Sequence, residues 1–492
     1  MKIHKQIACL PYYFFFLLLF LVTAKFPFFW DTIQLASKHA HFFYDSGFSG
    51  IILPNEIDSG HIPTLGLYIA LVWKIAGKSL LVSHIAMLPF VLGIVYQSII
   101  LVQRIFKENW SYSALIILLA DPTLLAQCTL VSPDVLLVFF FLLALNNLLI
   151  KNSLLYSLAL AGLTLSSMRG MMCVAGFYLA EVAIPFFNDN FIHDKQWLKK
   201  SFLNTINSAK LYLPSIIIAG AFFSWHFYKT GWIGYHKDMP WYPLFEIVDL
   251  KGAIRNILIL GWRLIDFGRV FIWIAGLFCV WHFYKNRPVI PETLKSILVV
   301  LVCISVSLFH AVIFHNNLSG HRYLLPVYLL ISVAVTQYIF SINFPWFLKR
   351  AVFIILFTGL LSGNFWIYPD RIAKGWDSTL AYLPYFALRE EMMNYMVKEN
   401  IPIDETGTLF PNSGQIDYID LSGRKDSFAE LDLKTNSYVF YSNIYNGFSD
   451  YELSELKNNW KELKNIRFLM VKVILYESPD KKIMSLTKKP YL

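Results

Sequence analysis

Two aspartates sit at the edges of apolar segments, where carboxylates can do acid–base chemistry. Asp31 follows the aromatic run Phe28-Phe29-Trp30, and Asp134 follows Ser132-Pro133 at the start of an apolar run. A carboxylate that loses hydration beside aromatic side chains becomes a better base. Asp31 and Asp134 are therefore candidate catalytic residues. The plainer alternative for Asp31 is a solvated loop acid or the N-cap of a helix over residues 32–42. The plainer alternative for Asp134 is the N-cap of the helix that follows it.

Basic residues suited to phosphate lie at the edges of other apolar segments. Arg169 stands between two such segments with no acid nearby, and His321-Arg322-Tyr323 opens a later one. A guanidinium can bind two phosphate oxygens at once. Arg169, His321 and Arg322 are therefore candidate ligands of a phosphate, whereas the alternative for the arginines is contact with lipid headgroups.

A third group, Glu56, Asp58 and His61, lies in one short stretch of the loop over residues 27–79. Two carboxylates and an imidazole could hold a divalent cation such as magnesium, manganese or zinc, or could contact an acceptor. The alternative is three solvated loop residues. All five cysteines fall inside apolar runs without a CxxC pair, which argues against a cysteine zinc site or a disulfide framework.

Long apolar segments must position these residues. The 492-residue chain is 56% hydrophobic and only 15% charged, whereas soluble proteins carry roughly 25% charge. Segments near 20 apolar residues cross a bilayer as helices. We count about eleven, at residues 7–26, 80–103, 112–131, 134–150, 153–168, 171–187, 211–228, 267–284, 296–314, 322–340 and 347–367. Residues 62–76 and 254–265 are shorter, and each is either a further span or an interfacial helix.

Basic residues in the short connectors predict the orientation. With a cytoplasmic N-terminus the inner connectors carry Arg104 and Lys107, Lys151, Lys195, Lys199 and Lys200, Lys285 and Arg287, and Lys349 and Arg350. The outer connectors hold little beyond Arg169 and Arg322, so the C-terminus is expected outside the membrane, which we expect to be a bacterial inner membrane. The first segment is expected to be a retained anchor rather than a signal peptide cleaved after Ala24.

The net charge of +9 does not indicate nucleic-acid binding, since no basic stripe with interleaved aromatic residues lies outside the spans.

The chain divides by composition at about residue 370. Residues 1–369 form the predicted transmembrane domain, an all-α polytopic bundle, and residues 370–492 a small α+β domain on the outer face. Helices are expected over 382–398 and 452–463, and strands over 437–441 and 468–476. The predicted topology brings Asp31, Asp134, Arg169 and Arg322 to one outer cavity, with carboxylates for an acceptor and cations for a phosphate.

The order of these motifs resembles glycosyltransferase family 39 and its relatives in the GT-C superfamily, the dolichyl-phosphate-mannose protein mannosyltransferases and the bacterial aminoarabinose transferases. The resemblance covers about residues 10 to 340. The chain departs from many members of the family at two places. It has Thr32 where they have a second acid, and His61-Ile62 where they have Lys or Pro. Its motifs are Trp30-Asp31-Thr32, His61-Ile62-Pro63-Thr64-Leu65, Asp121-Pro122, Ser132-Pro133-Asp134 and Arg322-Tyr323-Leu324-Leu325-Pro326.

The resemblance implies inverting transfer of a sugar from a polyprenyl-phosphate carrier, among the membrane lipids, to a protein, lipid or glycan acceptor. Asp31 would be the general base, and Asp134 would position the acceptor or stabilise charge at the anomeric carbon. Arg169 and Arg322, with His321 or a divalent cation, would stabilise the leaving phosphate. The alternatives are a polysaccharide polymerase or ligase that uses carrier lipids, a lipid or sugar transporter, and a non-catalytic scaffold. Transporters bind near the bilayer midplane, whereas these acids lie at outer span ends.

Overall fold

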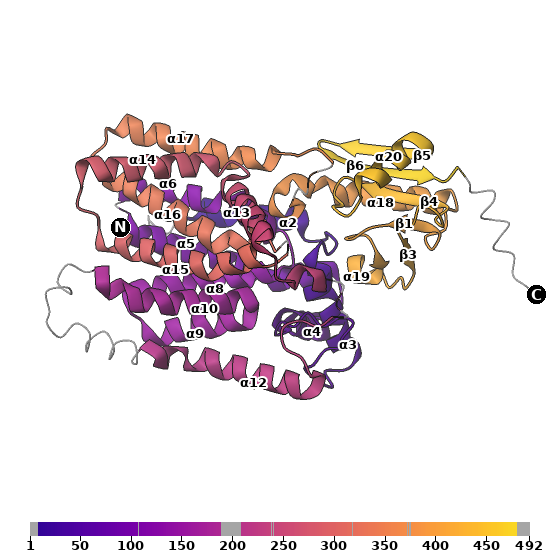
Figure 1. Cartoon of the computed structure of the whole chain (residues 1–492), viewed down its shortest axis with the longest axis horizontal. Helices are drawn as coiled ribbons and strands as arrows, with labels where there is room; N and C mark the ends of the chain where they lie inside the picture. The colour runs from indigo at the N-terminus through magenta and orange to yellow at the C-terminus, as the bar shows by residue number, and fades with distance from the viewer. Residues whose placement is uncertain are drawn as a thin grey trace, which may run out of the picture.

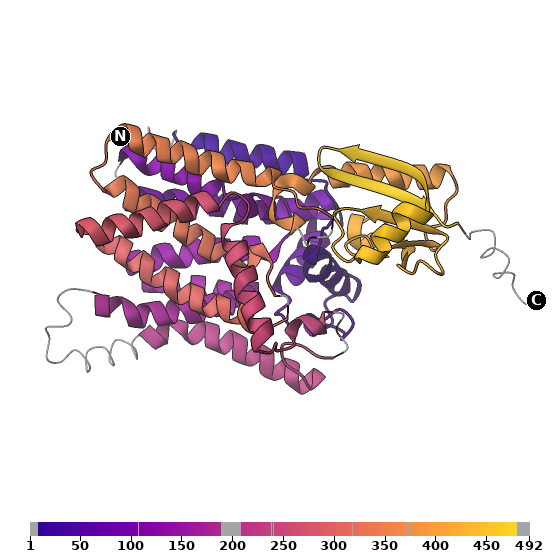
Figure 2. The same cartoon turned by 45° about the horizontal axis from the view of Figure 1, so that its top comes forward.

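The computed structural model describes residues 8–187 except 107, residues 208–316 except 238 and 240, and residues 318–479 except 371, 373 and 374. A bundle of helices forms one part, and a six-stranded sheet lies at one end of it (Figure 1 and Figure 2). The bundle helices are α2 (Leu10–Thr23), α5 (Leu80–Ile105), α6 (Glu108–Leu119), α7 (Pro122–Cys128), α8 (Pro133–Ile150), α9 (Ser153–Ser166), α10 (Met168–Ala183), α12 (Leu213–Thr230), α13 (Leu250–Ile265), α14 (Val270–Asn286), α15 (Glu292–Phe314), α16 (Leu325–Ser341) and α17 (Trp346–Ser362).

The predicted membrane bundle is present, but the count of about eleven spans is not confirmed. Among the described residues, 7 helices are long and apolar enough to cross a membrane, or up to 9 if each of two bent pairs is one span. The segment predicted over 112–131 bends by 66° between α6 and α7, where Asp121 caps α7 and Pro122 begins it. Residues 254–265 belong to α13, which meets α14 at 95°.

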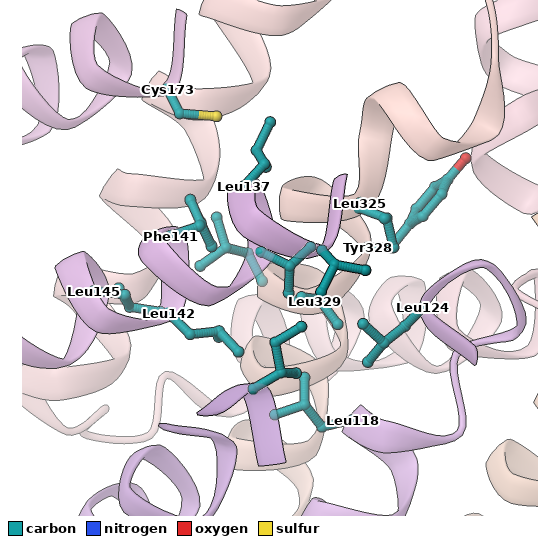
Figure 3. Packing of buried hydrophobic residues seen from close by; sticks show 14 of the residues in the cluster. Leu118, Leu124, Leu137, Phe141, Leu142, Leu145, Cys173, Leu325, Tyr328 and Leu329 are labelled. Carbon is teal, nitrogen blue, oxygen red and sulfur yellow. The ribbon is translucent and has the colours of Figure 1, made fainter. Parts of the chain in front are cut away.

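The centre of the bundle is α16, together with α8. In the span that contains α16, 94% of the residues are buried, against 22% in the span that contains α12. Leucines and aromatic residues of α8 and α16 interdigitate there, among them Leu142, Phe141 and Leu329 (Figure 3). A helix that is apolar on every side lies either inside a protein core or in lipid, and the burial of α16 shows that protein surrounds it. Side chains at the start of α16 are therefore held on the most enclosed helix.

The loop over residues 27–79 forms short helices at the sheet end of the bundle. A π-helix (Ile33–Lys38) continues into α3 (His39–Asp45), and α4 (Thr64–Ala76) packs against both. Gly66 allows this close approach, since a Cβ there would lie 2.2 Å from the Cβ of His39.

The C-terminal region is a mixed sheet with strand order β2-β3-β1-β4-β6-β5. The predicted strands correspond to β4 and β6, and the predicted helix over 382–398 to α18 (Pro384–Lys398). The helix predicted over 452–463 is α20 (Asp450–Asn459), because the chain continues as β5. The division at residue 370 stays a prediction. The strands are β1 (Thr406–Thr408), β2 (Gly414–Gln415), β3 (Ser427–Glu430), β4 (Tyr438–Ser442), β5 (Lys461–Phe468) and β6 (Val471–Glu477).

The C-terminal sheet region packs on the loop over residues 27–79. The ring of Phe29 stacks on that of Tyr382 with centroids 4.7 Å apart, and the N–H of Phe28 donates to the carbonyl of Ile419 at 2.8 Å. The connection between α14 and α15 lies at the opposite end of the bundle (Figure 1), as predicted for connectors on the other membrane face. The orientation itself stays a prediction. Lys107, Lys195, Lys199 and Lys200, used to predict it, lie outside the described residues.

Candidate functional site

Arg322 is the centre of a cluster of charged side chains at the sheet end of the bundle. It lies in the 3-10 turn η5 (His321–Leu324) that leads into α16. Each of its guanidinium nitrogens has a carboxylate partner: Nη2 pairs with Asp31, Nη1 with Asp377, and Nε lies 3.5 Å from Asp134. The exposed fraction of the side chain is 2% for Asp134 and 10% for Asp377, but 40% for Asp31. Asp31 is therefore the partner on the open side.

Arg169 is the second cation of the cluster. Its Nη1 pairs with Asp134, and its guanidinium lies 4.3 Å from the ring centroid of Tyr323, with that of Arg322 5.0 Å from the same ring. Cations are attracted to the face of an aromatic ring. Tyr323 and Asp134 thus hold both arginines at one place.

Local structure fixes Asp134 in the first turn of α8. Ser132 is the N-cap of that helix, and its Oγ accepts the N–H of Asp134 at 3.1 Å. The same hydroxyl donates to Oε1 of Gln127 on α7 at 2.5 Å. Capping is therefore done by Ser132, which leaves the Asp134 carboxylate for the two arginines.

Asp31 is not a helix cap either. The π-helix after it has Thr32 at the N-cap position, with no side-chain cap hydrogen bond. Trp30 has φ of 51°, a left-handed conformation that is uncommon for a residue with a side chain. This turn directs the Asp31 carboxylate to Arg322.

A small cavity brings these residues together, as the sequence predicted for Asp31, Asp134, Arg169 and Arg322. Asp377 also lines it and was not predicted. The signal that could have found it is Trp376-Asp377, which repeats the dipeptide Trp30-Asp31 just beyond the end of another apolar helix. The catalytic and phosphate-binding roles stay predictions. The other lining residues are Phe29, Thr32, Leu35, Gln127, Leu130, Ser132 and Pro133.

His321 does not line this cavity. Its side chain is fully buried, with Nε2 2.8 Å from Oδ2 of Asp266. Successive side chains of a 3-10 turn point about 120° apart, so His321 and Arg322 cannot face the same space. The predicted contact of His321 with a phosphate does not fit this placement.

The three residues predicted as metal ligands, Glu56, Asp58 and His61, have separate surroundings in the structure. Asp58 accepts the N–H of Gly60 at 2.7 Å and lies 2.9 Å from Nε2 of His226, while Glu56 is exposed. Nδ1 of His61 accepts the N–H of Met168 at 3.2 Å. Burial, followed by the nearby charge of Arg169, lowers the pKa of His61 to about 4, so it is neutral at pH 7.

No divalent cation fits these three side chains as a ligand set. Within the described ranges of the chain, no group of three or more His, Cys, Asp or Glu side chains is arranged to hold a metal ion. Glu56, Asp58 and His61 do not converge on one point in the described part of the chain, and the use of a divalent cation by the protein stays a prediction.

A fully buried arginine, Arg269, lies at the break between α13 and α14. Arg269 contacts both carboxylate oxygens of Asp121 at 2.8 Å, donates to Thr123 Oγ1 at 2.7 Å, and lies 3.7 Å from the ring centroid of Tyr328. The Arg269 and Asp121 side chains are each 1% exposed. This pair is sealed from any ligand and joins α7 to α14.

The fold and the cavity define a polytopic helical membrane protein with a charged site where the bundle meets a C-terminal sheet region. No protein-family model and no curated protein sequence matches the chain. Among solved structures it is similar to ArnT from Cupriavidus metallidurans, bound to undecaprenyl phosphate, with a TM-score of 0.50 and 10% sequence identity over 96% of this chain and 97% of that one. At this identity the likeness shows a shared fold alone.

Proposed function

We propose that the chain is a membrane glycosyltransferase that moves a sugar from a polyprenyl-phosphate carrier to an acceptor at the outer face of the membrane. The observation that carries the proposal is the cavity in which Arg169 and Arg322 lie among three carboxylates. The likeness to a protein crystallised with undecaprenyl phosphate agrees with it. A carrier tail stays in the bilayer, so a site at the end of the bundle suits its headgroup.

In this proposal the two arginines receive the leaving phosphate. Both are fixed before substrate arrives, Arg169 by Asp134 and Tyr323, and Arg322 by Asp134 and Asp377. Donors held in place where negative charge develops lower the barrier without reorganising during the reaction. Asp134 is 2% exposed, so we assign it to holding the arginines rather than to contact with the sugar.

Asp31 is the proposed general base because it is the most exposed carboxylate of the cluster. A donor phosphate that binds Arg322 replaces Asp31 there and frees its carboxylate for the acceptor. The acceptor oxygen then attacks the anomeric carbon, its proton passes to Asp31, and the bond from the carbon to the phosphate oxygen breaks with inversion. The carboxylate must come within about 3 Å of the hydroxyl.

The test is sugar transfer in proteoliposomes given radiolabelled polyprenyl-phosphate sugars and candidate acceptors. Asp31→Asn should lower the rate about 10²- to 10⁴-fold, the contribution of a general base. Asp45→Asn is the matched control, since Asp45 is an exposed acid in the same outer loop and should keep the wild-type rate. Full activity of the Asp31→Asn protein would remove Asp31 from the mechanism.

The same assay separates the alternatives. A transporter would move the labelled lipid between leaflets without a glycosylated product, and a polymerase would give a product of many sugar units. Either result would replace the proposed single transfer.

A further inference from the structure

We infer that Asp377 sets the charge of the donor site so that it favours a phosphodiester over a phosphomonoester, and thereby promotes release of the spent carrier. This inference rests on the proposed function. Asp377 lies in the segment that follows the last bundle helix. In the proposed reaction it neither activates the acceptor nor donates to the leaving phosphate.

The formal charge of the cluster is the first step. Two arginines, Arg169 and Arg322, stand against three aspartates, Asp31, Asp134 and Asp377. Each aspartate contacts at least one guanidinium of the cluster. Two positive and three negative charges leave the cluster at −1, and His61 is neutral beside it. Without Asp377 the cluster would be neutral.

The chemistry of the reaction is the second step. A polyprenyl-phosphate sugar is a phosphodiester with one negative charge. Transfer breaks its bond to the sugar and leaves a polyprenyl phosphomonoester, whose second ionisation has a pKa near 6. At pH 8 the product therefore carries about two charges. A negative cluster repels the product more than the donor, because Coulomb energy is proportional to charge.

The placement of Asp377 is the third step. Its carbonyl accepts from Nε2 of Gln127 at 2.7 Å, and the carbonyl of Ser378 accepts from Oγ1 of Thr123 at 3.0 Å. These two bonds tie the 3-10 turn η7 (Trp376–Ser378) to α7. With only 10% of its side chain exposed, the Asp377 carboxylate has little room to leave. Asp31 can give way to a phosphate, whereas Asp377 stays and repels it.

The experiment compares two lipids on the full-length protein in nanodiscs at pH 8: undecaprenyl phosphate, a monoester, and its methyl ester, a diester. Wild-type protein should bind the monoester no more tightly than the diester, despite the extra charge. Asp377→Asn should bind both more tightly. Since the repulsion is linear in charge, the fold-change for the monoester should be about the square of that for the diester.

Kinetics give a second measurement that a merely structural role would not produce. In Asp377→Asn the KM for the sugar donor and the kcat should both fall, because carrier and product are retained, and product inhibition should become stronger. Asp377→Glu should restore the wild-type values. Asp370→Asn is the matched control: Asp370 lies in the same segment but pairs with Lys472 at 2.5 Å, so its loss should change neither lipid affinity.

The outcomes are distinct. If wild-type protein binds the monoester tenfold more tightly than the diester, or if Asp377→Asn changes both affinities equally or not at all, the inference fails while the proposed function stands. If neither lipid binds wild-type protein, the proposed function fails, and the inference with it. The wild-type comparison decides the matter even if Asp377→Asn does not fold.

Discussion

Arg269 and Arg322 both have carboxylate partners inside the fold, but the surroundings of the two ion pairs differ. Arg269 and Asp121 are sealed at 1% exposure each, in a bidentate contact beneath Tyr328. Arg322 has three carboxylates instead of one, lines a cavity, and has one partner, Asp31, that is 40% exposed. The Arg269–Asp121 pair is thus enclosed by the fold, whereas the cluster around Arg322 keeps one accessible carboxylate.

The difference is informative because a buried ion pair is weak evidence for either stability or function by itself. The side chains of Arg269 and Asp121 are each 1% exposed, and Asp121 also caps α7 by accepting the N–H groups of Thr123 and Leu124. Arg322 has more carboxylates than its charge can neutralise, and one of them can be replaced. We therefore expect mutations at Arg269 to change stability and mutations at Arg322 to change activity.

The largest effect is expected at the sealed pair. Arg269→Met leaves the Asp121 carboxylate buried without its cation, which costs about 3–5 kcal/mol of stability. The measurement is the apparent melting temperature of the purified protein in detergent, which should fall markedly. The folded fraction should keep its transfer rate per molecule. A variant that melts like wild type would contradict the structural role.

A mutation in the cluster around Arg322 should instead lower the transfer rate and leave the stability almost unchanged. Arg322→Lys keeps the charge but cannot reach three carboxylates or bind two phosphate oxygens. Sugar transfer should fall by about 10²- to 10³-fold, with little change of melting temperature. Arg424→Lys is the control, since Arg424 pairs with Asp426 on the exposed surface. Wild-type transfer by Arg322→Lys would remove the distinction between the two arginines.

A double variant sharpens the comparison. Adding Asp121→Asn to Arg269→Met removes the unpaired charge while an amide oxygen can still cap α7. We expect about 1–2 kcal/mol of the lost stability to return, because the buried charge is the main cost. Melting temperatures of the two single variants and the double variant give the coupling between the sites. Additive losses would show that the two side chains act independently.

The smallest effect is expected at the contact between the outer loop and the sheet region. Lys78 Nζ lies 2.8 Å from Oδ2 of Asp417. Burial alone would raise the pKa of Asp417, but the hydrogen bond from Lys78, the N–H of Gly423 and the charge of Lys78 lower it below its usual value. Lys78→Met should cost about 0.5–1 kcal/mol at pH 7, with exposed Lys74→Met as the control.

The pH dependence of that contact has a defined sign. A depressed pKa in the folded state means that the contribution is present above the ordinary aspartate pKa of about 3.9 and is lost as the pH falls through the lower folded value. Wild-type protein should therefore lose more stability than Lys78→Met between pH 7 and pH 3. Parallel losses would show that the contact does not set the pKa of Asp417.

Much of the bundle follows from the sequence. Apolar length alone predicted α5, α8 and α15 near their observed bounds, because a helix in lipid must satisfy its own backbone. The charged segment ends also followed from topology: alternate crossings put Asp31, Asp134, Arg169 and Arg322 on one side. Asp121-Pro122 marks the break between α6 and α7 in the sequence. The mean hydropathy of residues 112–131 does not reveal this break, because the segment is apolar on both sides of it.

The sequence did not predict which charged side chains pair with one another. Asp31 and Arg322 are 291 positions apart, and Arg269 and Asp121 are 148 apart, so no local pattern records either pairing. His321 and Arg322 are neighbours in sequence yet face different surroundings, which only the turn before α16 decides. Sequence determined which residues are charged and which segments are apolar enough to form the bundle, since both depend on local composition. The tertiary structure decided which charges meet and which stay open to a ligand, because that depends on how distant helix ends pack.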